Sequence, residues 1–201
     1  LRLGPPIDET GPMLYDVLPI NKNLLSANFS ENIDSSKISA ESFAVTDTTG
    51  ADSVDIVTAY VPPGEPKKAR VRIKSPLDTA VKWELTAALD SAVAVRDSIG
   101  NLVRDTAHTG FFKPSTAPDT VRPTLLGPPL MDSTTGVDPD RIFLFEYNIA
   151  FDRLILFKET NLIKTDSAIP VTIDFNWIAA NRFEIVPKNK LAGNSWYRLD
   201  I

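Results

Sequence analysis

Carboxylates are the side chains of this sequence whose type and position could support chemistry. Glu31, Asp34 and Asp97 each stand near the end of an expected β-strand. Ca²⁺ is bound through several oxygen atoms supplied by loops, so these three residues are candidate calcium ligands. An aspartate in a tight turn also accepts hydrogen bonds from neighbouring backbone N–H groups. For Asp34 and Asp97, this role in a turn is favoured over a metal site.

Catalysis would need groups that the sequence does not bring together. A catalytic histidine works with a nucleophile and an orienting acid, but the single histidine, His108, stands between Ala107 and Thr109 beside a linker-like stretch. The absence of cysteine excludes disulfides, thiol catalysis and thiolate zinc sites. The sequence also lacks a glycine-rich phosphate loop, a nucleophile elbow and a metal-binding helix motif. We therefore expect no enzyme activity and no cofactor.

An exposed aromatic side chain could bind a glycan or a protein. Tyr197 and Leu199 share one face of the last expected strand, so the pleat turns Trp196 to the other face. The same alternation predicts that Trp83 and Trp177 belong to the core. Trp196 is therefore a candidate binding residue.

The pair Phe111-Phe112 is a second candidate, because it interrupts a stretch of linker composition, residues 104–121. Consecutive phenylalanines are disfavoured in solvent, so one interpretation is that both pack against the base of a domain and restrain a joint. The alternative is that they form an exposed site for a partner. We expect both to be at least partly buried at the joint.

Bulk composition limits the partners. Hydrophobic residues make up 43% of the 201, which is enough for a packed core. The net charge of −5 argues against nucleic acid as a partner, because binding it needs clustered positive charge. No apolar run approaches the roughly 18 residues of a membrane-spanning helix. The sequence begins at Leu1 without a signal region, which is typical of a mature or trimmed chain.

The elements that position these residues are predicted to be short β-strands. Apolar and polar residues alternate with a period of two, as in a half-buried strand, and no long segment has helical periodicity. The alternating segments lie around Val54 and Ile56, Val71 and Ile73, Val81 to Ala87, Phe143 to Tyr147, and Val171 to Phe175. Turn residues separate them at intervals of roughly 8–12 residues, which predicts a sandwich or barrel with helices only as short turns.

An internal repeat divides the sequence. Segments of the first half match segments of the second half in the same order, at offsets of about 112 to 119 residues. The matches join residues 28–33 with 144–149, 43–47 with 162–166, 54–56 with 171–173, 71–73 with 183–185, and 77–85 with 191–199. Each match is weak, but their shared order predicts two copies of one domain.

Several motifs of the repeat carry a family resemblance. The first copy contains Pro5-Pro6, Phe29-Ser30-Glu31-Asn32-Ile33-Asp34, Glu41-Ser42-Phe43, Pro76-Leu77, Trp83 and Asp97-Ser98-Ile99-Gly100-Asn101. The second keeps Pro128-Pro129, Phe145-Glu146-Tyr147-Asn148-Ile149 and residues 191–199, with Ala150 in place of Asp34. In these motifs the sequence resembles the bacterial Ig-like domains of S-layer and other cell-envelope proteins. The resemblance covers nearly the whole chain outside residues 104–121.

The resemblance implies an all-β chain of two tandem Ig-like Greek-key β-sandwich domains, residues 1–103 and 122–201, joined by a linker at 104–121. It also implies export to the cell envelope or extracellular surface, often as a lipoprotein anchored upstream of residue 1. The implied function is a non-catalytic structural or spacer module, with an envelope protein or glycan as partner. Two alternatives stay open: a glycan- or protein-binding module, and an accessory domain of a larger surface enzyme.

The end of the second copy carries a further expectation. The sequence stops at Ile201, before any match to the motif at residues 97–101, so we expect the second domain to lack its closing strand and to be the less stable. A strand left uncovered has unpaired N–H and C=O groups. We therefore expect Trp196 to Ile201 to lie at a sheet edge, free or paired with a neighbouring molecule.

Overall fold

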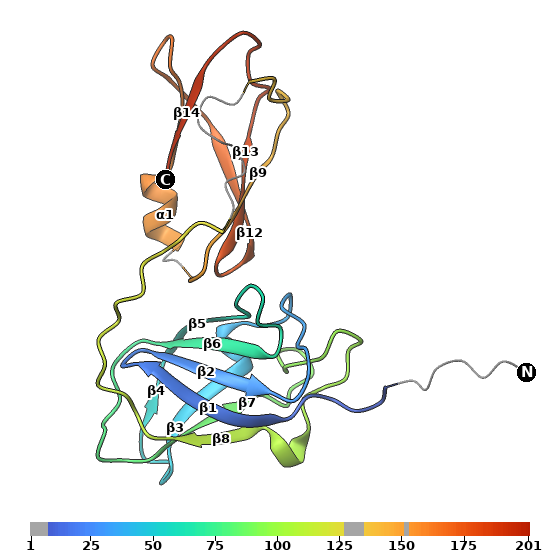
Figure 1. Cartoon of the computed structure of the whole chain (residues 1–201), viewed down its shortest axis with the longest axis vertical. Helices are drawn as coiled ribbons and strands as arrows, with labels where there is room; N and C mark the ends of the chain where they lie inside the picture. Colours follow the sequence, from blue (N-terminus) through green and yellow to red (C-terminus); the bar gives the residue numbers. More distant parts are fainter. Residues whose placement is uncertain (1–7, 127–134, 151–152) are drawn as a thin grey trace, which may run out of the picture. The chain divides into compact units, whose positions relative to one another are not determined.

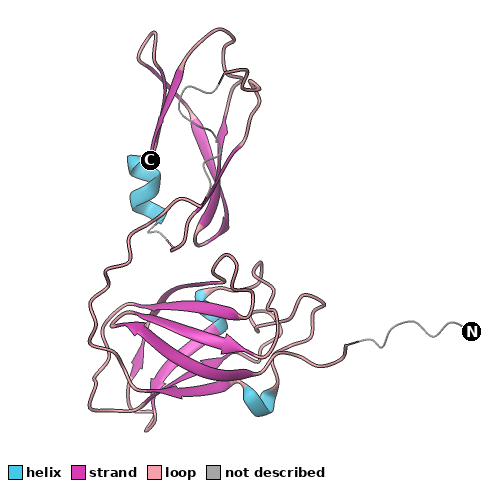
Figure 2. Ribbon diagram, viewed as in Figure 1, coloured by secondary structure: helices cyan, strands magenta, loops and turns pink. Residues whose placement is uncertain are grey.

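The structure is a computed structural model that describes residues 8–126, 135–150 and 153–201. The chain divides into two compact units, Leu1–Thr120 and Val121–Ile201, and each is described by itself. Both consist mainly of antiparallel β-strands (Figures 1 and 2). Within the described ranges the one α-helix, α1 (Arg153–Glu159), has only 7 residues. The expectation of an all-β chain with short helices is confirmed.

Two four-stranded antiparallel sheets form a β-sandwich in the first unit (Figure 1). The order in one sheet is β1-β2-β6-β5, and the order in the other is β4-β3-β7-β8. The strands span Leu14–Asn21 (β1), Leu24–Phe29 (β2), Phe43–Asp47 (β3), Ser53–Val54 (β4), Ile56–Tyr60 (β5), Lys68–Ile73 (β6), Trp83–Ala87 (β7) and Thr109–Phe112 (β8). Short 3-10 helices at Ala40–Ser42 and Asp105–Ala107 precede β3 and β8.

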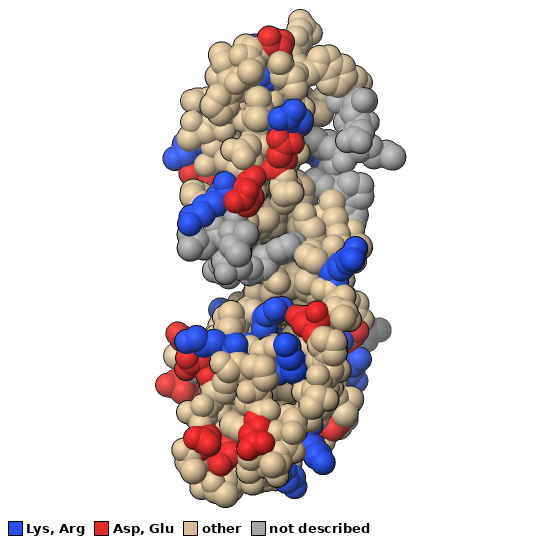
Figure 3. All heavy atoms as spheres, turned by 90° about the vertical axis from the view of Figure 1, so that its left-hand side faces the viewer, with Lys and Arg blue, Asp and Glu red and all other residues tan. Residues whose placement is uncertain are grey.

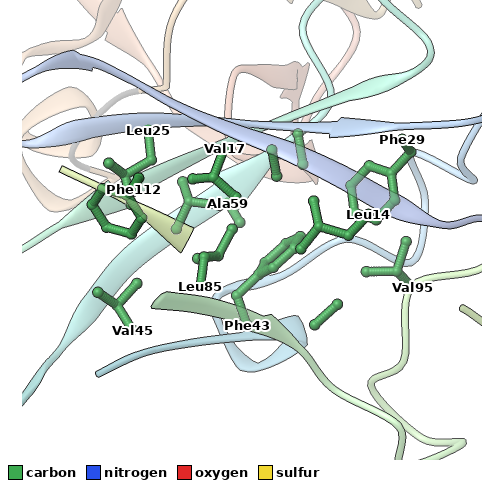
Figure 4. Close-up of a cluster of buried hydrophobic side chains, with 14 of the residues drawn as sticks. Leu14, Val17, Leu25, Phe29, Phe43, Val45, Ala59, Leu85, Val95 and Phe112 are labelled. Atoms are coloured by element: carbon green, nitrogen blue, oxygen red, sulfur yellow. The ribbon is translucent and has the colours of Figure 1, made fainter. Parts of the chain in front are cut away.

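The core of the first unit follows from the alternation along its strands. In β6 every second residue is buried, and the basic residues between them remain partly exposed. Val17 and Leu25 of one sheet share a buried cluster with Leu85 and Phe112 of the other (Figure 4). Complete burial of one such side chain contributes about 1.5–3 kcal/mol. The two inner faces therefore supply the main stabilisation of the sandwich.

The chain crosses from one sheet to the other between Val54 and Ile56. Val54 ends β4 and Ile56 begins β5, and these strands belong to different sheets. The single alternating strand expected here is therefore two strands, broken at Asp55. The Asp55 carboxylate lies 3.1 Å from Lys74 Nζ in an exposed ion pair, so the break is at the surface.

The segment expected to be a linker supplies the last strand of the first unit. Residues 109–112 form β8, which pairs with β7 and places Phe112 opposite Trp83. The first compact unit accordingly extends to Thr120, beyond the expected boundary at Val103. The linker-like composition of residues 104–121 therefore gave no indication of the four-residue strand β8.

Strand alternation separates the two residues of the Phe111-Phe112 pair. Phe112 is 4% exposed and lies in the core of the first unit. Phe111 is 54% exposed on the outer face, where Lys82 Nζ lies 4.7 Å from the centre of its ring. Phe112 therefore belongs to the core of the first unit and Phe111 to its surface, whereas the sequence placed both at one joint.

Residues 113–120, which follow β8, are held against the first unit. The backbone N–H of Lys22 donates to the carbonyl of Ala117 at 2.9 Å. Arg72 lies 3.2 Å from the carboxylate of Asp119. These contacts explain why the first unit includes residues as far as Thr120.

Two three-stranded antiparallel sheets form the second unit. Their orders are β12-β13-β9 and β11-β10-β14. The strands span Phe143–Glu146 (β9), Asn161–Lys164 (β10), Ile169–Val171 (β11), Ile173–Ala179 (β12), Arg182–Pro187 (β13) and Tyr197–Asp200 (β14). As in the first unit, a run expected to share one face is broken, because Val171 ends β11 and Ile173 begins β12.

Aromatic side chains dominate the core of the second unit. Phe183 is fully buried and stacks on Phe145, with 5.3 Å between the ring centres. Trp177 packs against Phe183 at 5.1 Å, as expected of a core residue. Tyr147 lies 6.2 Å from Phe183. Phe183 is therefore the centre of this cluster.

The last strand, β14, lies at a sheet edge, as expected. It pairs with β10 from Lys164 opposite Tyr197 to Asn161 opposite Asp200. In the described part of the chain, β10 is the one strand that β14 pairs with.

A carboxylate cluster as candidate functional site

Three carboxylates converge at one place in the first unit. Oxygen atoms of Asp8, Glu31 and Asp97 lie within 4.8 Å of one another. Glu31 follows the end of β2, and Asp97 lies close to it because the neighbouring Ile33 forms a β-bridge with Asp97. Asp8 is brought in by Asn101, whose Nδ2 donates to the Asp8 carbonyl at 3.0 Å.

Hydrogen bonds within turns fix both aspartates of the cluster. The buried Asp97 accepts three backbone N–H groups at Oδ1, from Ile99 at 3.0 Å, Gly100 at 2.7 Å and Asn101 at 2.8 Å. Gly100 has φ +100°, a conformation that glycine adopts without strain. Asp8 Oδ1 accepts the N–H and the hydroxyl of Thr10. The turn role expected of Asp97 is confirmed.

Asp34, the third residue expected among the calcium candidates, is not part of the cluster. Its Oδ1 accepts the backbone N–H of Ser36 at 2.9 Å and the Ser36 hydroxyl at 2.7 Å, so its expected turn role is also confirmed. Asp8 takes the third place in the cluster, and sequence reasoning missed it. Nothing in the linear pattern near Asp8 indicates that Asn101 will bind the backbone beside it.

The electrostatics of the cluster centre on Glu31. Burial raises the pKa of the Glu31 carboxyl, and the negative charges of Asp8 and Asp97 raise it further, while Arg104 opposes them. The pKa of Asp8 is lowered, first by the hydrogen bond from the Thr10 hydroxyl. Three carboxylates are a donor set that a hard cation such as Ca²⁺ accepts. The turns of Asp8 and Asp97 also account for their positions without a cation.

Glu31→Gln is expected to raise the Tm of the first unit at pH 7 and to leave it unchanged near pH 3. Because the folded state raises the pKa of Glu31, ionisation of this group favours unfolding. The penalty grows as pH rises from about 4, through the folded pKa, and is complete above it. Thermal melts across this range at low salt would detect the change.

Repeating the melts with millimolar Ca²⁺ separates repulsion from cation binding. A cation held by the cluster would stabilise the native chain and have less effect on the glutamine variant. A lower Tm for Glu31→Gln at pH 7 without added metal would contradict the electrostatic account.

The remaining candidate residues lie apart from the cluster. His108 Nδ1 is hydrogen-bonded to the backbone carbonyl of Asp105 in a turn before β8. Trp83 is buried, and its Nε1 donates to the Asp78 carbonyl at 3.0 Å. Trp196 is 56% exposed, as the pleat predicted.

The distribution of surface charge and the length of the helices are relevant to nucleic acid and membrane as partners. On the face drawn in Figure 3, basic and acidic side chains are interspersed over both units. In the described residues no helix is both long enough and apolar enough to span a membrane.

Comparison with known proteins gives distant structural likenesses. No family model and no curated protein matches the sequence. Among solved structures, domains 1–6 of the surface layer protein SbsC align with 94% of this chain, at 12% identity and a TM-score of 0.46. The N-terminal part of the bacterial S-layer protein SbsC aligns with the same share, identity and TM-score. The chain covers 25% of the first structure's length and 43% of the second's.

Proposed function

We propose that this chain is a non-catalytic structural module of the cell envelope, built from two copies of one Ig-like domain. The observation that carries the proposal is a common order of strands. The order β2-β6-β5 in the first unit corresponds to β9-β13-β12 in the second. The order β4-β3-β7 corresponds to β11-β10-β14. The first unit adds β1 and β8 outside these three-stranded cores.

Register supports the same correspondence. Val45 of β3 lies opposite Leu85 of β7, and Leu162 of β10 lies opposite Leu199 of β14. Val45 and Leu162 also each lie opposite a valine of the following strand. Sequence similarity aligned Val45 with Lys164, whereas strand pairing matches Val45 with Leu162. The two positions in β10 are two residues apart and therefore lie on the same face of the strand. Related chains keep such core pairs when loop lengths change.

The point at which the chain crosses from one sheet to the other also supports two copies of one domain. In the first unit the chain changes sheet at Asp55, and in the second it changes sheet at Thr172. A helical segment precedes the third strand of the first unit and also its counterpart in the second, namely Ala40–Ser42 before β3 and α1 before β10.

The strand order of the first unit also supports an Ig-like assignment. An Ig sandwich has strands A, B, E and D in one sheet and C, F and G in the other. The order β1-β2-β6-β5 corresponds to A-B-E-D, and β3-β7-β8 corresponds to C-F-G, with β4 as an additional edge strand. The motif resemblance supports export to the envelope. Two such domains in series suit a spacer.

Glycan or protein binding through Trp196 is a second candidate, because this large aromatic side chain is exposed. Such a role predicts that Trp196→Ala abolishes retention on an immobilised envelope glycan. Tyr15→Ala is the matched control, since it removes another exposed aromatic side chain. An unchanged retention of the Trp196 variant would exclude this candidate.

Pulling the chain from its two ends tests the spacer proposal. We expect two separate unfolding events, because each unit has its own core. The strands of the first unit lie between Leu14 and Phe112, and a chain of that length extends by about 350 Å. Those of the second unit lie between Phe143 and Asp200, and that length extends by about 200 Å. One event that releases the combined length would contradict two independent domains.

A further inference from the structure

An open groove lies at one end of the sheet β4-β3-β7-β8. It has a volume of about 510 Å³ and is lined by the turn before β7, residues 79–82, and by residues 111–113 at the end of β8. This volume is in the range of small-molecule sites. Every lining residue belongs to the first unit, so the groove is a feature of one domain alone.

The register of β7 and β8 sets two lysines opposite each other in this groove. Trp83 lies opposite Phe112 at the last pair of the ladder. One step further, the same register brings Lys82 opposite Lys113, and both residues line the groove. Like charges directly opposite each other on paired strands are destabilising. The two lysines are therefore an unfavourable arrangement in the free chain.

The charge of the two lysines is not neutralised by the protein. The basic residues of β6 and of the turn after it each lie 2.9–3.2 Å from a carboxylate oxygen. In the part of the chain that the structure describes, neither Lys82 nor Lys113 has such an ion pair, and no acidic residue lines the groove. The net charge of the whole chain is −5. The groove is therefore a local positive site on an acidic protein.

Phe111 adds an aromatic surface to the groove. Its side chain is 54% exposed, and it shares the outer face of the sheet with Lys82 because the buried Phe112 alternates with it. Lys82 Nζ lies 4.7 Å from the centre of the ring. The face of an aromatic ring is electron-rich, so it packs well against the C–H groups of a sugar ring. The groove thus combines two positive charges with an exposed aromatic ring.

We propose that this groove binds an acidic glycan, a polymer of sugars that carry carboxylates. A carboxylate between Lys82 and Lys113 replaces their mutual repulsion by two attractions. A sugar ring beside that carboxylate packs against Phe111. Arginine, whose forked guanidinium matches phosphate, is absent from the groove, which favours a carboxylate over a phosphate. The inference goes beyond the proposed role as a spacer and does not depend on it.

An acidic peptide fits the groove less well. Peptides commonly bind a β-domain by adding a strand to the edge of a sheet. The strand β8 ends at Phe112, so the groove lies past the end of the ladder and offers side chains in place of a row of backbone groups. The carbonyl of Lys82 already accepts the N–H of Thr48 at 3.0 Å. A glycan does not need such a row of backbone partners.

Titration of the 201-residue chain with oligogalacturonate, followed by amide chemical shifts in NMR spectra, tests the proposal. We expect a weak, saturable complex at low salt, with the largest shifts at residues 79–82 and 111–113. A maltooligosaccharide of the same length carries no carboxylate and should cause no shifts there. The affinity should decrease as salt is added, because exposed charges are screened.

Lys113→Glu separates loss of binding from damage to the fold. It should raise the Kd for oligogalacturonate at least about tenfold, since an attraction becomes a repulsion. It should also raise the Tm of the free chain's first unit at low salt, because it sets an acid opposite Lys82. A damaged fold cannot produce both results. Lys37→Glu is the matched control, because it makes the same charge change at another exposed lysine of this unit and should leave the Kd unchanged.

Phe111→Ala distinguishes a glycan from a peptide. It should raise the Kd for oligogalacturonate about fivefold and leave that for poly-glutamate, which has no sugar ring, unchanged. Phe111→Trp should preserve binding, and Tyr15→Ala, which removes another exposed aromatic ring of this unit, is the matched control. Absence of shifts at the groove with oligogalacturonate, or equally tight binding of poly-glutamate by the native chain, would overturn the proposal.

Discussion

Replacing Phe112 by alanine is expected to destabilise the first unit by about 3–5 kcal/mol, the usual cost of deleting a buried phenylalanine ring. Phe112 lies in the core opposite Trp83 and is the last residue of β8. Its loss leaves a cavity between β8 and the first sheet. Phe111→Ala, one residue away, should cost less than about 1 kcal/mol, because it removes an exposed ring and a cation–π contact with Lys82.

Urea unfolding of the two variants would measure this difference. The comparison distinguishes a core strand from a linker, since in a linker neither residue would affect the stability of the sandwich. Equal and small effects of both variants would show that β8 is not part of the first unit's core.

Replacing Phe183 by alanine is expected to destabilise the second unit by a similar amount, about 3–5 kcal/mol. Phe183 is fully buried and contacts Phe145, Phe175 and Trp177. The second unit has fewer strands to compensate for a lost ring, so this variant should unfold it at ordinary temperature. The first unit should keep its native stability, because no residue of its core cluster belongs to the second.

Near-ultraviolet circular dichroism and tryptophan fluorescence would follow the loss of structure around Trp177. The double variant with Phe112→Ala should show additive effects, since the two sites lie in separate cores. A Phe183→Ala chain that loses both units in one transition would contradict independent folding.

Much of the fold could be predicted from alternation, and its failures have physical causes. Val71, Ile73 and Leu85 were correctly assigned to core faces because a strand pleat has a fixed period of two. The same rule cannot detect a change of sheet, so the breaks at Asp55 and Thr172 were missed. The strand β8 was missed because four residues beside a proline-rich stretch give too short a pattern. The helix α1 was missed because its 7 residues make only about two turns, too few for a helical period to stand out.

The candidate site could be predicted only where its contacts are local. Asp34 and Asp97 were assigned to turns correctly, since their partners lie within four residues. Asp8 was missed because its place depends on Asn101, and only the folded chain brings the two together. The raised pKa of Glu31 likewise arises from burial in the folded chain and from the charges of Asp8 and Asp97, which are distant in sequence.

Cross-strand Hα–Hα contacts measured by NMR test the central claim, two copies of one sandwich, most directly. Antiparallel pairs that are not hydrogen-bonded bring their Cα atoms to about 4.5 Å, close enough for strong nuclear Overhauser effects. The claim predicts one such effect between Val45 and Leu85 and an equivalent one between Leu162 and Leu199. If Leu199 instead contacted a strand of the β12-β13-β9 sheet, the units would not share a topology, and the proposal of a repeated domain would fail.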